Sequence, residues 1–297
     1  MSHKKEMNFF RNIKFFRNIR KPEKRRIGLA LSGGGMRGVA HLGVVKLLEE
    51  NSLYPDMIAA TSAGSVVGSI FALGIKAEDA FTYLKKANIR EIMRRSYRRE
   101  FSLKQGSEHV SKKGAALIAG DVVEQVLLDF YGEKTFADVK IPFLAIASDI
   151  YHMEEVVLEE GLLARACSAS SAIPGVFSPV QEDERVLVDG MLFNNLPADV
   201  LRKRGMDKVV SVNLKAAGVE GVKSLRFTEV IGVSLDIMSY ATMHRGIEQT
   251  DLMISPDLRG FGTYSLSDGA LQEMFDIGYE AAKGQLSELK AVFGGSV

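Results

Sequence analysis

The chain has 297 residues and a net charge of +1, and 46% of its residues are hydrophobic and 25% charged, as in a globular protein with a large core. No stretch approaches the roughly 20 apolar residues of a membrane span, and no apolar segment typical of a secretory signal peptide follows the basic N-terminus. The single cysteine, Cys167, excludes an intrachain disulfide and a cysteine-based zinc site. We therefore expect a cytoplasmic protein, peripheral at a membrane where it meets one.

The N-terminal segment differs in charge from the rest. Residues 1–26 hold ten Lys or Arg and two Glu, a net charge of +8, whereas the remaining residues carry −7. A six-residue unit, FFRNIK at 9–14 and FFRNIR at 15–20, combines aromatic and cationic side chains, which suit an interface with anionic lipid. A solvated tail and a helix packed on the body are the alternatives. We expect residues 1–25 to form a basic tail and 26–297 to form one domain.

The body opens with alternating strands and helices. The apolar run 27–31 ends in a glycine cluster, as a buried strand does, and apolar residues at helical spacing predict a helix over 38–50. A second strand is predicted over 57–60, and a helix of small residues over 63–73 with Gly74 as its stop. This order predicts a parallel sheet with helices on its faces.

The later elements are less regular. We predict helices over 77–99, 121–131, 162–170 and 267–293, and strands over 141–150, 154–158, 185–188 and 209–212. The helix over 77–99 becomes basic at Arg94, Arg95, Arg98 and Arg99, which suits either an anionic bilayer or a solvated helix end. Residues 102–118 contain polar and glycine breaks and predict a flap or loop.

Ser62 is the candidate nucleophile. It lies between the strand over 57–60 and the helix over 63–73, where a tight turn would expose its hydroxyl at the sheet edge. Such a turn needs small neighbours, and Ala60, Ala63 and Gly64 supply them, although Ala60 stands where the G-x-S-x-G pattern has glycine. A simple helix N-cap is the alternative role of this serine.

A glycine loop precedes the first helix, and its backbone amides are free to face an anion. It comprises Gly33, Gly34, Gly35, Met36, Arg37 and Gly38. A dinucleotide site would need an acidic residue near the end of the second strand, but Asp56 lies before that strand. An oxyanion hole needs only amides beside Ser62, and loops after neighbouring parallel strands share one edge. Arg37 would add charge, hold the loop or make a structural ion pair.

Asp189 is the candidate base. None of the five histidines, His3, His41, His109, His152 and His244, lies in a motif typical of a general base. Asp189 ends the strand over 185–188, so its carboxylate would reach the sheet edge and accept the serine proton if partial desolvation raised its pKa. An ordinary Asp-Gly turn is the alternative.

These motifs, in this order, resemble the patatin-like phospholipase family. The resemblance runs from about Ile27 to Leu214 and includes the glycine loop, Ala60 to Gly64, Asp189-Gly190 with 194–197 (NNLP), and two stretches between them, 141–149 and 170–177. Ala60 and Met191 depart from the family pattern.

The resemblance implies an α/β, patatin-like three-layer fold with a central, mainly parallel sheet, and a hydrolase domain over 26–297. It implies Ser62 as nucleophile, Asp189 as base and the loop 33–38 as oxyanion hole, with the amides of Gly34, Gly35 and Met36 as donors. We expect hydrolysis of phospholipid or lysophospholipid acyl esters, with no metal, organic cofactor or nucleic acid, and an anionic membrane as partner of the tail. A soluble carboxylesterase or thioesterase and a non-catalytic binding protein are the alternatives.

Overall fold

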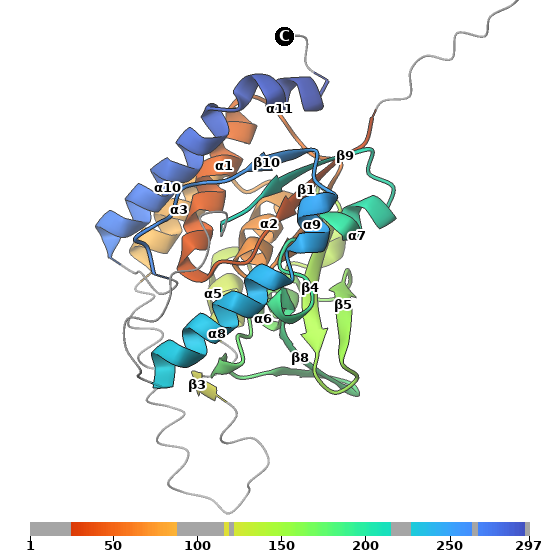
Figure 1. Cartoon of the computed structure of the whole chain (residues 1–297), viewed down its shortest axis with the longest axis vertical. Coiled ribbons are helices and arrows are strands. Elements are labelled where there is room, and N and C mark those ends of the chain that lie inside the picture. Colours follow the sequence, from red (N-terminus) through yellow and green to blue (C-terminus); the bar gives the residue numbers. More distant parts are fainter. Residues whose placement is uncertain (1–24, 88–115, 119–121, 215–226, 263–266, 295–297) are drawn as a thin grey trace, which may run out of the picture.

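The computed structural model describes residues 25–87, 116–118, 122–214, 227–262 and 267–294 (Figure 1). The basic tail up to residue 24, the arginine cluster at 94–99 and residues 102–115 of the predicted flap lie outside the described residues. Within the described residues, no helix is both long and apolar enough to cross a bilayer.

A central sheet has the strand order β10-β9-β1-β2-β4-β8-β7, with β5 also paired to β4. Its strands are β1 (Ile27–Leu31), β2 (Met57–Thr61), β4 (Phe143–Asp149), β5 (Glu154–Leu158), β7 (Val180–Glu182), β8 (Arg185–Asp189), β9 (Lys208–Val212) and β10 (Leu252–Ile254). The run from β10 to β4 is parallel, whereas β5, β7 and β8 pair antiparallel. A separate pair joins β3 (Ala116–Ile118) to β6 (Gly175–Phe177).

Helices cover both faces of the sheet (Figure 1). Alternation along β1 shows why, since Leu29 and Leu31 enter one core and Ala30 the other. The first core contains α1 (Val39–Glu50), α2 (Ala63–Leu73), α3 (Ala77–Lys86), α5 (Val122–Tyr131), α6 (Leu163–Ser170), α10 (Asp268–Lys283) and α11 (Leu286–Val292). The second contains α7 (Ala198–Lys203) and the residue before α9 (His244–Glu248). The predicted three-layer α/β fold is confirmed.

The ends of β2 and β8 meet along one edge of β4. β2 pairs with β4 as far as Thr61 opposite Ile146, and β8 pairs with the next part of β4, from Asp149 back to Ala147 opposite Asp189. Because β5 pairs along 145–149 and so takes the other edge of β4, β2 and β8 approach each other end to end. The residue after β2 and the last residue of β8 are therefore neighbours.

Two predicted helices do not run unbroken over their predicted ranges. The helix from Ala77 ends at Lys86, because Ala87 adopts an extended conformation with ψ 114°. The helix predicted over 267–293 is instead α10 and α11, separated by a turn at Gly284 and Gln285. Glycine is a weak helix former, and Gln285 has a φ of −117°, outside the helical range. Of the predicted flap, 116–118 form strand β3.

Three further elements lie near the ends of β2 and β8. They are the 3₁₀ helices η1 (Gly35–Gly38) and η3 (Gly190–Leu192), and α8 (Phe227–Ala241), which packs on η3. A third 3₁₀ helix, η2 (Phe136–Asp138), precedes β4.

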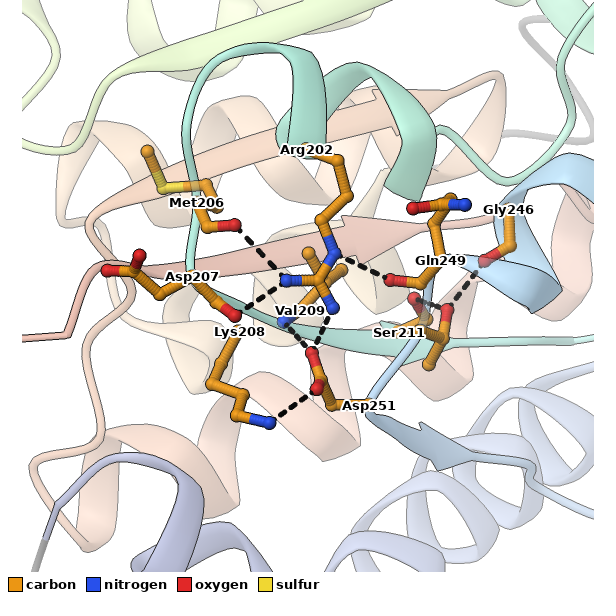
Figure 2. A network of polar contacts seen from close by, with 10 residues as sticks. Arg202, Met206, Asp207, Lys208, Val209, Ser211, Gly246, Gln249 and Asp251 are labelled. Atoms are coloured by element: carbon orange, nitrogen blue, oxygen red, sulfur yellow. Dashed lines mark hydrogen bonds and ion pairs between the residues drawn. The ribbon is translucent and has the colours of Figure 1, made fainter.

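The sheet edge at the start of β9, opposite the edge at which β2 ends, is stabilised by a polar network (Figure 2). Arg202 of α7 donates to the carbonyls of Asp207, at 2.6 Å, and Gln249, at 3.1 Å, and also pairs with Asp251. Asp251 further accepts from Lys208 at 2.7 Å and from the amide of Val209 at 2.8 Å. These bonds tie α7, β9 and β10 together at the start of β9, away from the ends of β1 and β2.

Candidate active site

Ser62 occupies the strained turn between β2 and α2. Its φ of 55° and ψ of −127° lie in a region that non-glycine residues rarely adopt. The turn also needs glycine two residues later, because a Cβ on Gly64 would lie 2.5 Å from the carbonyl oxygen of Leu31. As N-cap of α2, Ser62 lies at the positive end of that helix's dipole.

The Ser62 hydroxyl donates to the Asp189 carboxylate, with 2.6 Å between Oγ and Oδ2. Both side chains are buried, Ser62 being 5% and Asp189 0% exposed. The second carboxylate oxygen of Asp189 accepts from the amide of Met191 at 2.9 Å, and the Asp189 carbonyl accepts from Ser148 at 2.9 Å. The carboxylate is thus held with Oδ2 toward the serine, in the arrangement of a nucleophile and its base.

The glycine loop lies directly against this turn. A Cβ on Gly38 would lie 2.6 Å from the Cβ of Ala63, and a Cβ on Gly33 would lie 3.0 Å from that of Ser62. Gly35, with φ 59°, opens η1, and the first amides of such a helix have no partner within it. The amide of Gly33 is committed elsewhere, since it donates to Asn195 at 3.2 Å. Gly34, Gly35 and Met36 therefore remain as the amides available to an oxyanion.

Arg37 holds the loop from behind. Its Nε donates to the carbonyl of Phe261 at 2.8 Å, which joins η1 to the segment after β10. Of the predicted roles, the geometry matches the one in which Arg37 holds the loop.

The described histidines do not contact Ser62. His41 is buried and donates from Nε2 to the carbonyl of Ser32 at 2.8 Å, and burial lowers its pKa to about 4. His152 pairs with Asp149 at 2.6 Å on the hairpin between β4 and β5, and His244 starts α9. Among the described residues, no cluster of three His, Cys, Asp or Glu could hold a metal ion. Cys167 is free and buried, and burial raises the pKa of its thiol to about 11.

An apolar cavity of about 220 Å³ opens beside Ser62. One face of α2 lines it from Ser62 inward, with Ala63, Val66, Val67 and Ile70. Helices α1, α3 and α5 supply most of the other lining, with Leu42, Tyr83 and Phe130 among it, and η1 and the segment 171–177 complete it. Ile70 follows Ala63 by seven positions of helix, so the cavity follows α2 for about 10 Å.

Comparison with known proteins places the chain in a family. The family model for patatin-like phospholipase matches residues 29–202. The chain belongs to the patatin-like phospholipase family. An uncharacterized NTE family protein of Mycobacterium tuberculosis is 32% identical over 194 residues, which are 64% of this chain and 30% of that protein. Mouse patatin-like phospholipase domain-containing protein 6 is 28% identical over 190 residues, 63% of this chain and 13% of that protein. The chain thus spans less than a third of either relative.

Two solved structures share the fold. VipD from Legionella pneumophila has a TM-score of 0.53 at 14% identity, covering 89% of this chain and 67% of that one. Human GIVD cytosolic phospholipase A2 has a TM-score of 0.51 at 10% identity, covering 91% and 63%. At these identities the similarity concerns the fold.

Both departures from the patatin-like pattern are accommodated. The methyl group of Ala60 faces Gly68 of α2, where an added Cβ would lie 3.3 Å from that of Ala60. Met191 is buried in a small apolar cluster with Ile173 and Phe177, and so forms an apolar wall beside Asp189.

Sequence reasoning did not single out two serines of this site. Ser170 accepts from the amide of Ser62 at 2.9 Å and donates to the carbonyl of Ile146 at 2.6 Å, which braces the nucleophile turn against β4. Ser171 lines the cavity, and its buried hydroxyl has no hydrogen-bond partner among the described residues. Both lie in the stretch 170–177 that carries the family resemblance, which was the available signal.

Proposed function

We propose that this protein is a serine acyl hydrolase that cleaves fatty-acyl esters of phospholipids or lysophospholipids. The observation that carries the proposal is the 2.6 Å contact between Ser62 and Asp189 at an apolar cavity. Membership of the patatin-like phospholipase family supports the same substrate class.

The proposed reaction proceeds in two stages. Ser62 Oγ attacks the ester carbonyl carbon while its proton passes to Asp189 Oδ2, and the amides of Gly34, Gly35 and Met36 stabilise the negative oxygen. The intermediate collapses, the carbon–oxygen bond to the alcohol breaks, and Asp189 returns the proton to the leaving alcohol. Water then attacks the acyl–Ser62 ester and gives a proton to Asp189. The bond between the acyl carbon and Ser62 Oγ breaks, Asp189 returns the proton to Oγ, and the fatty acid is released.

The cavity supports an apolar acyl group. Its walls are formed mainly by aliphatic and aromatic side chains, most of them from four helices, so an acyl chain that leaves water gains roughly 0.8 kcal/mol per buried methylene. A length of about 10 Å along α2 accommodates the part of the chain next to the ester. A soluble carboxylesterase or thioesterase would use the same dyad, so the choice of substrate must be tested.

The test measures fatty-acid release from mixed phospholipid liposomes and hydrolysis of a short soluble ester, without added metal. We expect activity in the wild type and a loss of at least about a thousandfold in Ser62→Ala and Asp189→Asn, because each removes one half of the dyad. Asp251→Asn is the matched control, because this carboxylate belongs to the network at the opposite edge and the variant should keep its activity.

Each contrary result has a definite meaning. Hydrolysis of the soluble ester alone, dependent on Ser62, would replace the lipid hydrolase with an esterase. Folded wild-type protein that is inactive on both substrates would favour a binding protein. Liposomes with and without anionic lipid, compared for the full chain and for a chain lacking residues 1–24, test the proposed role of the basic tail.

A further inference from the structure

Exposed apolar side chains gather at the sheet edge that holds Ser62. Among the described residues, eleven large hydrophobic side chains are exposed, and all but Tyr54 and Ile247 belong to three segments at this edge. Those segments are α8, the residue after η3, and the tip of the β4–β5 hairpin. The side chains are Val230, Ile231, Ile237, Met238 and Tyr240 of α8, then Phe193, then Ile150, Tyr151 and Met153 of the tip.

The outer face of α8 is apolar and carries no charged side chain. Val230, Ser234, Ile237, Met238 and Ala241 are all exposed and recur at helical spacing on one face. The hydroxyl of Ser234 donates to the carbonyl of Val230 at 2.8 Å, within the helix itself. The surface helix of a globular protein normally places charged residues on this face, so its composition indicates contact with something other than water.

The inner face of α8 packs on a wall of the cavity. Leu235 contacts the apolar cluster that contains Ile173, Phe177 and Met191, and Ile173 and Phe177 also line the cavity beside Ser62. At the end of the helix, Thr242 donates to the carbonyl of Met191 at 2.7 Å. The helix α8 thus covers the outside of the cavity wall that Ile173 and Phe177 form.

The hairpin tip is a second, independent apolar element at this edge. It directly follows the end of β4, and its Tyr151 and Met153 are 71% and 78% exposed. Its position is fixed because Asp149, which is buried, accepts from the amide of Tyr151 at 2.8 Å and from that of Val186 at 3.2 Å.

We propose that α8 and the 150–153 tip form the surface with which this protein lies on a lipid bilayer, an inference that rests on the proposed function. Amphipathic helices bury an apolar face at the boundary between headgroups and acyl chains, and aromatic side chains favour that depth. A phospholipid has to pass from the bilayer into the cavity on whose wall α8 packs, and this docking brings the cavity to its substrate. A second copy of the chain on the same face would instead close off that approach.

The test is cosedimentation with vesicles of phosphatidylcholine alone, whose zero net charge removes the attraction to the basic tail. We expect the double variant Ile237→Asp, Met238→Asp to bind at least about tenfold more weakly than the wild type, because two charges enter the apolar face. Hydrolysis of a soluble short-chain ester should not change. Tyr54→Asp is the matched control, because this exposed side chain precedes β2 at the opposite edge and should leave vesicle binding intact.

A second variant, Ile150→Asp, Met153→Asp, changes the hairpin tip, where the substitutions cannot interrupt a helix. It should also bind vesicles more weakly than the wild type. Unchanged vesicle binding in both folded variants would overturn the proposal. A wild-type dimer that becomes a monomer in the α8 variant, with vesicle binding retained, would show a contact between copies and would also overturn it. The wild type could also bind vesicles yet hydrolyse no ester. If both variants then bind vesicles more weakly than the wild type, the docking proposal is supported and the proposed hydrolase function is contradicted.

Discussion

At the scale of single residues, Ser62, the proposed nucleophile, combines a strained backbone with several supports. A φ of 55° costs a serine about 1–3 kcal/mol, which surrounding contacts must offset. Ser170 holds the Ser62 amide, Ser65 donates to the Ser62 carbonyl at 2.6 Å, and Gly64 lets α2 start against the end of β1. The places of Ser62 and Asp189 at the sheet edge were predicted from the sequence, because Ser62 directly follows a buried strand and Asp189 ends one. Ser170 did not, because its role depends on contact across more than 100 residues.

Ser171 is expected to contact the substrate. Its hydroxyl is buried at the cavity and has no partner among the described residues, and an unpaired buried hydroxyl is costly unless a ligand or water satisfies it. We expect Ser171→Ala to lower kcat/KM for ester hydrolysis by roughly three- to tenfold, the equivalent of one hydrogen bond, without loss of thermal stability. Ser69→Ala is the control, because that hydroxyl is bonded to Val66 within α2 and does not line the cavity. A stability loss with unchanged kcat/KM would assign Ser171 a structural role.

At the scale of elements, the active site depends on strand pairing that periodicity does not reveal. The apolar run ending at Asp189 predicted a strand but not its direction. Asp189 does lie at the expected edge of the sheet, although its strand is antiparallel to β4. β8 is antiparallel to β4, yet it pairs only with 147–149, so Asp189 still arrives beside the end of β2. Gly190 permits this approach, because a Cβ there would lie 2.3 Å from the carbonyl oxygen of Ile146. Sequence reasoning also missed α8, for a different reason: its exposed face lacks the charged residues that mark the surface helix of a globular protein.

The α2 helix should set the acyl length that the cavity accepts. Ile70 lies about two turns from Ser62 at the inner part of the cavity, so a larger side chain there shortens the space for a chain. We expect Ile70→Phe to lower kcat/KM for esters of long acyl chains by roughly tenfold or more and to leave butyrate esters within about twofold, because overpacking affects only the far end. Leu73→Phe is the control, because Leu73 is buried on the same helix but does not line the cavity. It should change kcat/KM for long-chain esters and for butyrate esters by the same factor. Equal loss on short and long esters in Ile70→Phe would contradict this use of the cavity.

At the scale of the whole molecule, the sheet edge at the start of β9 and the edge at the end of β2 differ in structure. The edge where β9 begins is closed by the charged network around Arg202 and Asp251, whose bonds are all within the protein. The edge where β2 ends carries the strained turn, the cavity and the exposed apolar side chains. Mutations at the first edge should therefore change stability, and mutations at the second should change function. Mutations in the core between the two edges should change the stability of the whole domain.

His41 makes that stability depend on pH. It is buried in the core beside the start of the glycine loop, and its pKa is lowered by burial from 6.5 to about 4. Between these values the unfolded chain binds more protons than the folded one, so stability is fully present above pH 6.5 and is lost as the pH falls toward 4. From pH 7.5 to pH 5 the loss due to this residue is about 2 kcal/mol.

We expect urea unfolding to show this loss in the wild type and a correspondingly smaller loss in His41→Gln, which keeps a donor for the Ser32 carbonyl but cannot be protonated. The comparison of pH dependence between the two proteins removes the contribution of other titrating groups. His244→Gln is the control, because His244 is exposed at the start of α9 and the substitution should leave the wild-type slope intact. Proton NMR of the His41 ring provides an independent check, since it should remain neutral at pH 5. An equal loss in the wild type and in His41→Gln, or a ring that is protonated at pH 6, would show that the buried histidine does not govern stability in this range.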